Sequence, residues 1–282
     1  MVRNPCGIPA AHDGSMTPSV AHEEKAQQPA AREESKPAVA IINADDWGRD
    51  KEVTDRTLEC VLAGAVSSAS AMVFMEDAER AAALAKQHDV DTGLHLNLTT
   101  PFSAPAVPSR LVEEQGRLTR FLRASRLAPA ICHPGLAACF RYVVEAQLEE
   151  YERLYHRPPA RVDGHHHMHL CANVQMQKLL PPGTIARRNF SFAPGEKGAV
   201  NRLYRRWQDH RLARRHRMTD FFFSLPPIDP PGRLEKIFGL ATHATVEIET
   251  HPVNAEEYRF LTGGELLRRK GSVGIARGYV LP

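Results

Sequence analysis

The 282-residue chain has only five cysteines, and no two of them form a Cys-x-x-Cys pair. An odd number of scattered cysteines gives no sign of a regular disulfide framework, so we expect a reducing, cytoplasmic setting. No window of about 18 apolar residues is present, and the sequence therefore predicts no transmembrane segment. The formal net charge is only +3, which by itself is too small to indicate a nucleic-acid partner.

The first 36 residues also have almost no large apolar side chains and are rich in Ala, Pro, Glu, Ser and Gln. Such a segment cannot bury enough surface to offset the loss of chain entropy, so it is predicted to be a disordered leader. It has no apolar stretch of the kind found in secretory signals. We expect residues 37–282 to form a single domain.

From residue 38 onward, apolar runs typical of buried strands alternate with helical patterns. The predicted strands are 38–45, 67–74, 91–98, 160–167, 183–190, 219–225 and 244–251. The predicted helices are 55–64, 76–87, 136–157, 172–180, 232–240 and the stretches on either side of Gly263–Gly264. Between the third strand and the long helix, residues 99–133 contain several prolines and are predicted to form a long loop.

This alternation of strands and helices favours a parallel sheet with crossover helices. Six or seven strand–helix units predict an α/β fold of the TIM-like (β/α) barrel type. A seven-stranded, incompletely closed barrel fits this count. An open, doubly wound sheet is the alternative.

Residues suited to catalysis lie where the predicted strands end. Asp45 and Asp46 follow the first apolar run, and His95 lies late in the third strand. His165 opens a stretch in which four of the chain's 14 histidines occupy five positions, and His251 ends the last strand. The carboxyl ends of parallel strands form the rim where barrels build active sites, so these side chains can converge.

One aspartate with two histidines is a suitable ligand set for a catalytic divalent metal, because it leaves a coordination position for water and substrate. The cation lowers the pKa of bound water and polarises a carbonyl, and a second carboxylate can accept the water's proton. Alternate residues of a strand share a face, so the four clustered histidines cannot all bind one ion. The competing interpretation is that the histidines are structural and that Asp45–Asp46 caps the following helix.

These stretches together resemble the YdjC-like carbohydrate deacetylase family, which includes chitooligosaccharide deacetylases and hopanoid-associated relatives. The matching stretches occur in the family's order and are IINADDWG, TGLHLNLT, RVDGHHHMH, the arginine in GTIARRN, and VEIETHP. The resemblance implies a barrel-like α/β fold and a hydrolase that removes acetyl groups from N-acetylated sugars. It also implies one divalent metal ion: imidazole ligands favour Zn²⁺, and a single carboxylate with waters is compatible with Mg²⁺.

The resemblance assigns roles by position. The implied metal ligands are Asp46, His95 and His165. The implied catalytic residues are Asp45 as general base, His251 as general acid and Arg187 as the residue that orients the acidic pair. Neighbouring candidates for contact with the substrate, an N-acetylated sugar or glycolipid, are Trp47, Asn97 and His167.

The resemblance does not explain residues 201–218, which hold seven arginines. If this segment is helical, Leu203, Trp207 and Leu212 form a narrow apolar side. A solvated helix over the rim of the barrel is the simplest interpretation. The alternatives are contact with an anionic substrate, with an anionic membrane surface or with nucleic acid. The chain shows no further nucleic-acid motif, which argues against the last.

Two other functions compete with deacetylation. A metal-dependent phosphoesterase or nuclease would use the arginine-rich segment to hold phosphate, but two-metal sites need more carboxylates than the predicted strand ends show. A catalytically inactive metal-binding or basic interaction protein would not need Asp45, Asp46 and His251 together. The sequence therefore favours a metal-dependent carbohydrate N-deacetylase.

Overall fold

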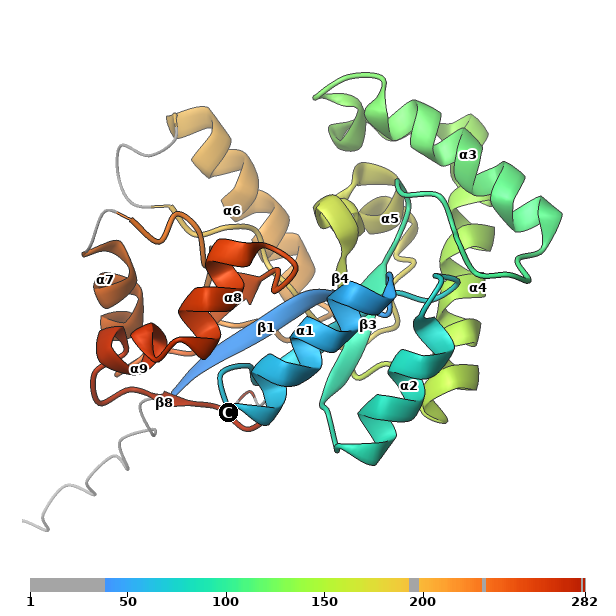
Figure 1. Cartoon of the computed structure of the whole chain (residues 1–282). Coiled ribbons are helices and arrows are strands. Elements are labelled where there is room, and N and C mark those ends of the chain that lie inside the picture. Colours follow the sequence, from blue (N-terminus) through green and yellow to red (C-terminus); the bar gives the residue numbers. More distant parts are fainter. Residues whose placement is uncertain (1–38, 193–197, 230–231, 280, 282) are drawn as a thin grey trace, which may run out of the picture. The chain divides into compact units, whose positions relative to one another are not determined.

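A curved parallel β-sheet forms the centre of the fold (Figure 1). The structure is a computed structural model that describes residues 39–192, 198–229, 232–279 and 281. The strands are β1 (Val39–Trp47), β2 (Ser68–Ala71), β3 (Thr92–Leu96), β4 (Arg161–Gly164), β5 (Ile185–Ala186), β6 (Phe221–Ser224), β7 (Val246–Thr250) and β8 (Gly274–Ile275). Seven strands lie in the order β5-β4-β3-β2-β1-β7-β6, and β8 pairs with β1. All these pairings are parallel.

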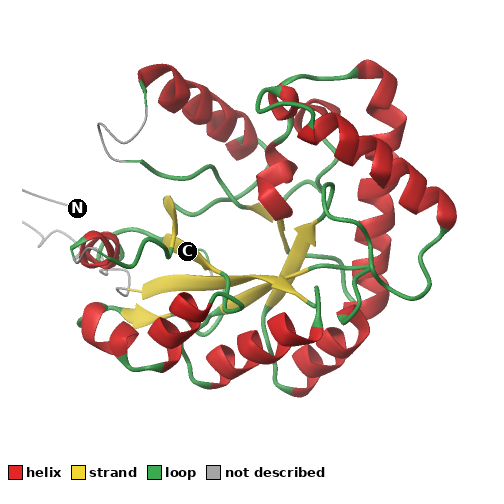
Figure 2. Ribbon diagram, turned by 45° about the horizontal axis from the view of Figure 1, so that its top comes forward, coloured by secondary structure: helices red, strands yellow, loops and turns green. Residues whose placement is uncertain are grey.

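Helices follow the strands and lie on the outside of the curved sheet, as Figure 2 shows. The α-helices are α1 (Lys51–Leu62), α2 (Ala78–Gln87), α3 (Ser109–Arg123), α4 (Ala137–Tyr155), α5 (Ala172–Gln177), α6 (Ala199–Ala213), α7 (Arg233–Leu240), α8 (Ala255–Thr262) and α9 (Glu265–Arg269). The short 3₁₀ helices are η1 (Ala128–Ala130), η2 (Pro134–Leu136) and η3 (His165–Leu170). Among the described residues, no helix is long and apolar enough to cross a membrane.

Around the sheet, β1 to β7 follow one another in chain order, with β7 next to β1. The circle is open between β5 and β6, as expected for a barrel that does not close fully. An isolated bridge between Ile185 and Arg217 and a hydrogen bond from Ser191 N to Phe222 O (2.8 Å) cross this gap in part. The sheet is thus a half-barrel, which confirms the predicted TIM-like α/β fold with seven strands and incomplete closure. The open doubly wound sheet is not observed.

The predicted loop at 99–133 is wrong, because α3 occupies its centre. Pro108 lies immediately before the helix and Pro129 lies after it, so both prolines delimit the helix without interrupting it. The helix is held by buried Leu118 and Leu122, which belong to the apolar core that α4 also contributes to. The predicted leader, residues 1–36, lies outside the described residues, and the division into leader and domain stays a prediction.

Side chains on the two faces of the strands differ in character. On β1 and β7, Ile42, Ala44, Val246 and Ile248 pack into an apolar cluster with the helices. The alternate positions carry polar or charged side chains that are almost fully buried, as they are on β2, β3 and β4. These polar positions include Asn43, Asp45, Ser68, Ser70, His95, Arg161, Asp163, Glu247 and Glu249. The interior of the half-barrel is therefore a polar network next to the ends of the strands.

Candidate active site

The end of β1 is distorted in a way that lets two successive side chains reach the same place. The pairing of β1 with β2 shifts register between Ala44 and Trp47. Asp46 has φ 67°, in the left-handed region that aspartate tolerates better than most residues. In a regular strand, Asp45 and Asp46 would point to opposite faces. The irregular backbone brings both carboxylates to the rim of the half-barrel.

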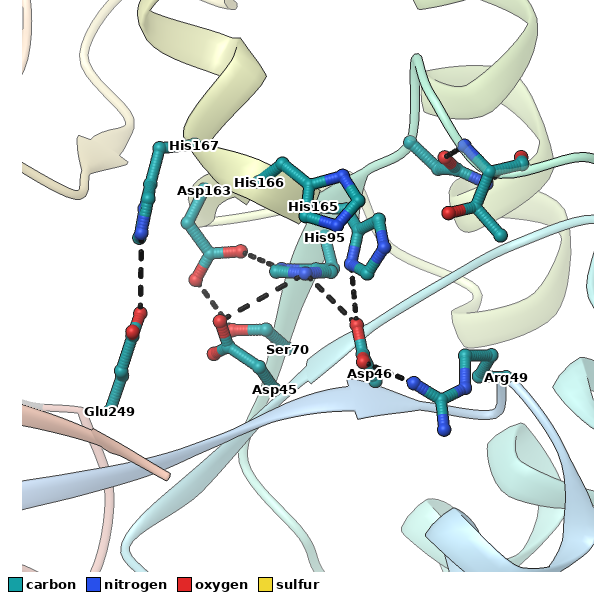
Figure 3. Close-up of polar contacts among 12 residues, drawn as sticks. Asp45, Asp46, Arg49, Ser70, His95, Asp163, His165, His166, His167 and Glu249 are labelled. Atoms are coloured by element: carbon teal, nitrogen blue, oxygen red, sulfur yellow. Dashed lines mark hydrogen bonds and ion pairs between the residues drawn. The ribbon is translucent and has the colours of Figure 1, made fainter. Parts of the chain in front are cut away.

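Asp46, His95 and His165 meet at this rim, from the ends of β1, β3 and β4 (Figure 3). Oδ1 of Asp46 lies 2.8 Å from Nδ1 of His165 and 3.3 Å from Nε2 of His95. One ligand atom from each residue lies within 4.8 Å of the other two. Oδ2 of Asp46 is held separately by Nη1 of Arg49, 2.7 Å away. The structure thus brings together all three metal ligands implied by the family resemblance.

The chemistry of these donors fits a divalent metal ion. Oδ1 of Asp46 is buried and makes no hydrogen bond, although both imidazoles lie close to it. Burial raises the pKa of Asp46, but His165 and His95 outweigh this and hold it well below its usual range. An ionised, unbonded carboxylate oxygen facing two imidazole nitrogens is a suitable set of ligands for one cation.

Asp163 orients His95 from the opposite side of the imidazole ring. Its Oδ1 lies 2.7 Å from Nδ1 of His95, and Ser70 donates a hydrogen bond of 2.5 Å to its Oδ2. When Nδ1–H of His95 donates a hydrogen bond to Asp163, Nε2 on the other side of the ring faces Asp46. Burial lowers the pKa of His95, but Asp45 and Asp163 outweigh it and raise the pKa to about 10. The surrounding carboxylates therefore favour positive charge on the imidazole of His95.

Asp45 is held by Arg187, which lies directly after β5. Nη1 and Nη2 of Arg187 each donate a hydrogen bond of 2.7 Å to one oxygen of Asp45. Asn43 donates a further hydrogen bond of 2.9 Å to the same carboxylate. Burial raises the pKa of Asp45, but the Arg187 guanidinium outweighs it and lowers the pKa. Asp45 is thus an ionised carboxylate in a fixed orientation.

The fully buried Arg187 also binds three further carboxylates. Its Nε donates to Glu247 (2.8 Å), its Nη1 lies 3.4 Å from Glu249, and its Nη2 lies 3.2 Å from Asp163. Burial lowers the pKa of this arginine, but the surrounding carboxylates outweigh it and raise the pKa well above its usual value. Burial, reinforced by Asp45, raises the pKa of Glu249.

Three further carboxylates of the site were not predicted, although the period-two alternation of a strand marks each of them: Asp163, Glu247 and Glu249. Asp163 precedes His165 by two residues, and the two glutamates alternate with apolar residues in VEIET. The site is therefore richer in carboxylates than expected. A second possible ligand group, Asp45, His95 and Asp163, is already bonded within the network through Arg187. In this second group Arg187 binds both Asp45 and Asp163, so the guanidinium supplies positive charge there.

The family model described as YdjC-like protein matches residues 39–262, a range that contains all of these site residues. The chain belongs to the YdjC-like protein family. Among its relatives, the carbohydrate deacetylase of Mus musculus is 35% identical over 140 residues, covering 48% of this chain and 44% of that protein. The chitooligosaccharide deacetylase of Serratia marcescens is 36% identical over 135 residues, which cover 46% of this chain and 50% of that protein. The chain therefore matches about half the length of these curated relatives.

A solved structure from Enterococcus faecalis V583, named for cellobiose-phosphate cleavage, has a similar fold to this YdjC-like chain. The TM-score is 0.57, and the alignment covers 86% of this chain and 97% of that one. The sequence identity is 19%, so this similarity concerns the fold alone.

In this YdjC-like chain, His251 lies directly after β7 and is half-buried. Its backbone N–H donates a hydrogen bond of 2.8 Å to Glu257. Within the described part of the chain, its imidazole makes no hydrogen bond or ion pair. His251 thus lies at the same end of the sheet as Asp45, and its role as general acid stays a prediction.

The candidates for substrate contact lie in different surroundings. Trp47 is fully buried in the apolar core. Asn97 is also fully buried, and its side chain accepts hydrogen bonds from the backbone N–H groups of Thr99 and Thr100, which shapes the loop after β3. His167 is partly exposed and packs edge-on against Phe190, with ring centroids 4.7 Å apart. Of the three, His167 has the most accessible side chain, and contact with substrate stays a prediction for each.

Proposed function

We propose that this chain is a metal-dependent carbohydrate N-deacetylase. The reaction is hydrolysis of the acetamido bond of an N-acetylated sugar, in an oligosaccharide or a glycolipid, to acetate and a free amine. The observation that carries the proposal is the group Asp46, His95 and His165 next to the ionised pair of Asp45 and Arg187. Relatives named carbohydrate deacetylase and chitooligosaccharide deacetylase support this reaction class.

Asp46, His95 and His165 would hold one divalent metal ion, Mg²⁺ or Zn²⁺. Such an ion, when bound, polarises the acetyl carbonyl and makes a bound water more acidic. Asp163 fixes the ring of His95 and so keeps Nε2 directed toward the position where it would bind the metal. Arg49 binds the second oxygen of Asp46, which leaves Oδ1 directed at the two histidines.

Asp45 is the proposed general base, and Arg187 keeps it ionised and oriented. Because its pKa is lowered, Asp45 is ionised at neutral pH and can accept the proton of the attacking water. The oxygen of that water bonds to the acetyl carbon, and the bond from this carbon to nitrogen then breaks. His251, at the same end of the sheet, is proposed to donate a proton to the departing amine nitrogen.

Acetate release from N-acetylglucosamine oligomers tests this proposal, with bis(p-nitrophenyl) phosphate as a control substrate. We expect acetate release that a chelator abolishes and that added Zn²⁺ or Mg²⁺ restores, with no phosphodiester hydrolysis. His165→Asn should lose the activity, whereas His243→Asn, at an exposed histidine outside the site, should keep it. Phosphodiester hydrolysis without acetate release, or acetate release that chelation and His165→Asn leave unchanged, would refute the proposal.

A further inference from the structure

Helix α6, tan in Figure 1, exposes an apolar face. The exposed fractions are 84% for Val200, 69% for Leu203, 38% for Tyr204 and 52% for Trp207. Spacings of three, four and seven residues place these four side chains on one side of the helix. We call Val200, Leu203, Tyr204 and Trp207 the α6 apolar face. Surface helices usually direct such a face toward the core, so its exposure needs an explanation.

The opposite side of α6 is already anchored. Asp209 is buried and accepts hydrogen bonds from Arg188 (3.0 Å) and from the side chain of Asn189 (2.8 Å). Leu212 is buried in the apolar core on this side, so the expectation that it shares a side with Leu203 and Trp207 is wrong. Gln208 donates a hydrogen bond to the backbone oxygen of Leu170 in η3 (3.1 Å). The helix is therefore seated on the domain, and the α6 apolar face points away from its anchored side.

The exposed charged side chains of α6 itself are all of one sign, although the carboxylate of Asp220, outside the helix, lines the same cavity as Leu203. Asp209 is the sole carboxylate in the helix, and it is buried on the anchored side. The guanidinium of Arg211 lies over the ring of Trp207, 4.9 Å from its centroid. Arg206 and Arg214 are exposed and flank the same region. The surface is thus apolar and aromatic, with cations at its margins.

We propose that α6 docks this protein on an anionic lipid surface. Leucine and valine would enter the outer edge of the acyl region, while tryptophan and tyrosine would lie at the level of the headgroups. The arginines would contact lipid phosphates. A second copy of the chain would place arginines against arginines, and an uncharged protein surface would leave them unmatched. Charge complementarity therefore favours an anionic partner, and the exposed leucine, valine, tyrosine and tryptophan between the arginines fit the interface of an anionic membrane.

The docking helix also lies next to the candidate active site. It contacts η3, which begins with His165, through Gln208. Arg205 of α6 lies over Phe192, and Phe190 packs against His167. Between α6 and these phenylalanines is a cavity of about 540 Å³, lined by four arginines and by Asp209 and Asp220. Docking through α6 would hold this side of the rim at the lipid surface.

Vesicle flotation of the full-length chain tests the docking. Vesicles of phosphatidylcholine alone are compared with vesicles that also contain phosphatidylglycerol. We expect flotation only with phosphatidylglycerol, and weaker flotation as salt increases. The first test variant is Leu203→Ser with Trp207→Ser, which should abolish flotation. Its control is Leu62→Ser with Leu267→Ser, at leucines that are equally exposed elsewhere.

A second pair of variants tests the charges. The test variant replaces Arg206, Arg211 and Arg214 with glutamine, and its control replaces the arginines at 141, 259 and 268, on α4, α8 and α9. Each arginine removed from the docking surface should weaken partition by about fivefold. Both controls should float like the unmodified chain, and circular dichroism verifies that all variants are folded.

Three results would overturn the proposal. The unmodified chain does not float with phosphatidylglycerol vesicles. Alternatively, all the variants float as well as the unmodified chain, which would assign the binding to another segment. Lastly, light scattering shows a dimer that Leu203→Ser with Trp207→Ser dissociates, without vesicle binding, which would make the α6 apolar face a contact between copies.

Discussion

Oδ1 of Asp163 and Nδ1 of His95 lie 2.7 Å apart, between neighbouring strands β4 and β3. Because one ring nitrogen of His95 is bound to this carboxylate, the other is directed at Asp46. The carboxylate itself is held by Ser70 and Arg187, so the orientation of a metal ligand depends on a network that extends across the interior of the half-barrel.

Removing the charge of Asp163 should weaken metal binding without removing a ligand. Asp163→Asn keeps the shape but not the anion that supports His95, so we expect metal affinity to fall by roughly 10–100-fold. Calorimetric titration with Zn²⁺ measures this. Asp229→Asn, at an exposed carboxylate, is the matched control and should bind normally. Unchanged affinity in Asp163→Asn would show that His95 needs no such support.

Replacing Asp46 should weaken metal binding, whereas replacing Asp45 should slow catalysis. Asp46→Asn gives up the anionic ligand, so metal affinity should fall and excess metal should restore part of the activity. Asp45→Asn should keep its metal but lose about 10²–10⁴-fold in kcat, the usual contribution of a positioned general base. Metal titration with acetate-release kinetics distinguishes them. If Asp45→Asn loses the metal and Asp46→Asn keeps it, the two roles are reversed.

Arg187 should be essential for stability as well as for orientation. It is fully buried among four carboxylates, Asp45, Asp163, Glu247 and Glu249. Lysine keeps the positive charge but cannot donate two parallel hydrogen bonds to Asp45, so Arg187→Lys should lower the free energy of unfolding by about 1.5–3 kcal/mol for each charge-assisted hydrogen bond lost. Arg188→Lys, at a partly exposed arginine, should cost less than about 1 kcal/mol. Urea denaturation of both variants is the measurement, and equal losses would contradict this account.

His169 should make the protein less stable in mild acid. It is fully buried and its Nε2 donates to the backbone oxygen of Arg187 at 2.9 Å. Burial lowers its pKa from 6.5 to about 4. The folded state thus binds this proton less readily than the unfolded state, so stability is present above pH 6.5 and is lost as the pH falls toward 4. The full effect is about 3 kcal/mol.

His169→Gln tests this, because glutamine can donate the same hydrogen bond without titrating. Unfolding free energies measured between pH 7 and 4 (about the range of the shift) should fall less steeply in the variant than in the unmodified chain. His243→Gln, at an exposed histidine, should leave the slope unchanged. Parallel curves for His169→Gln and the unmodified chain would show that His169 does not titrate in this way.

The alternation of strands and helices could be predicted from the sequence alone, as could the position of Asp46, His95 and His165 at the ends of strands. These features follow from local hydrophobic periodicity and from the rule that parallel strands end at a common rim. The periodicity was less informative at 99–133, where prolines suggested a loop. There the tertiary structure decided the outcome, because burial of Leu118 and Leu122 against the core stabilises α3 between its flanking prolines.

Which charged side chains meet depends on how the chain folds in three dimensions. Arg187 follows a two-residue strand, yet it binds Asp45 from β1, Asp163 from β4 and Glu249 from β7. No local sequence pattern predicts that these side chains bind the same guanidinium, because their convergence depends on the curvature and register of the sheet. The exposure of α6 has the same origin. Its sequence specifies an amphipathic helix, but the anchoring of Asp209 selects which side faces the domain and leaves the aromatic side outside.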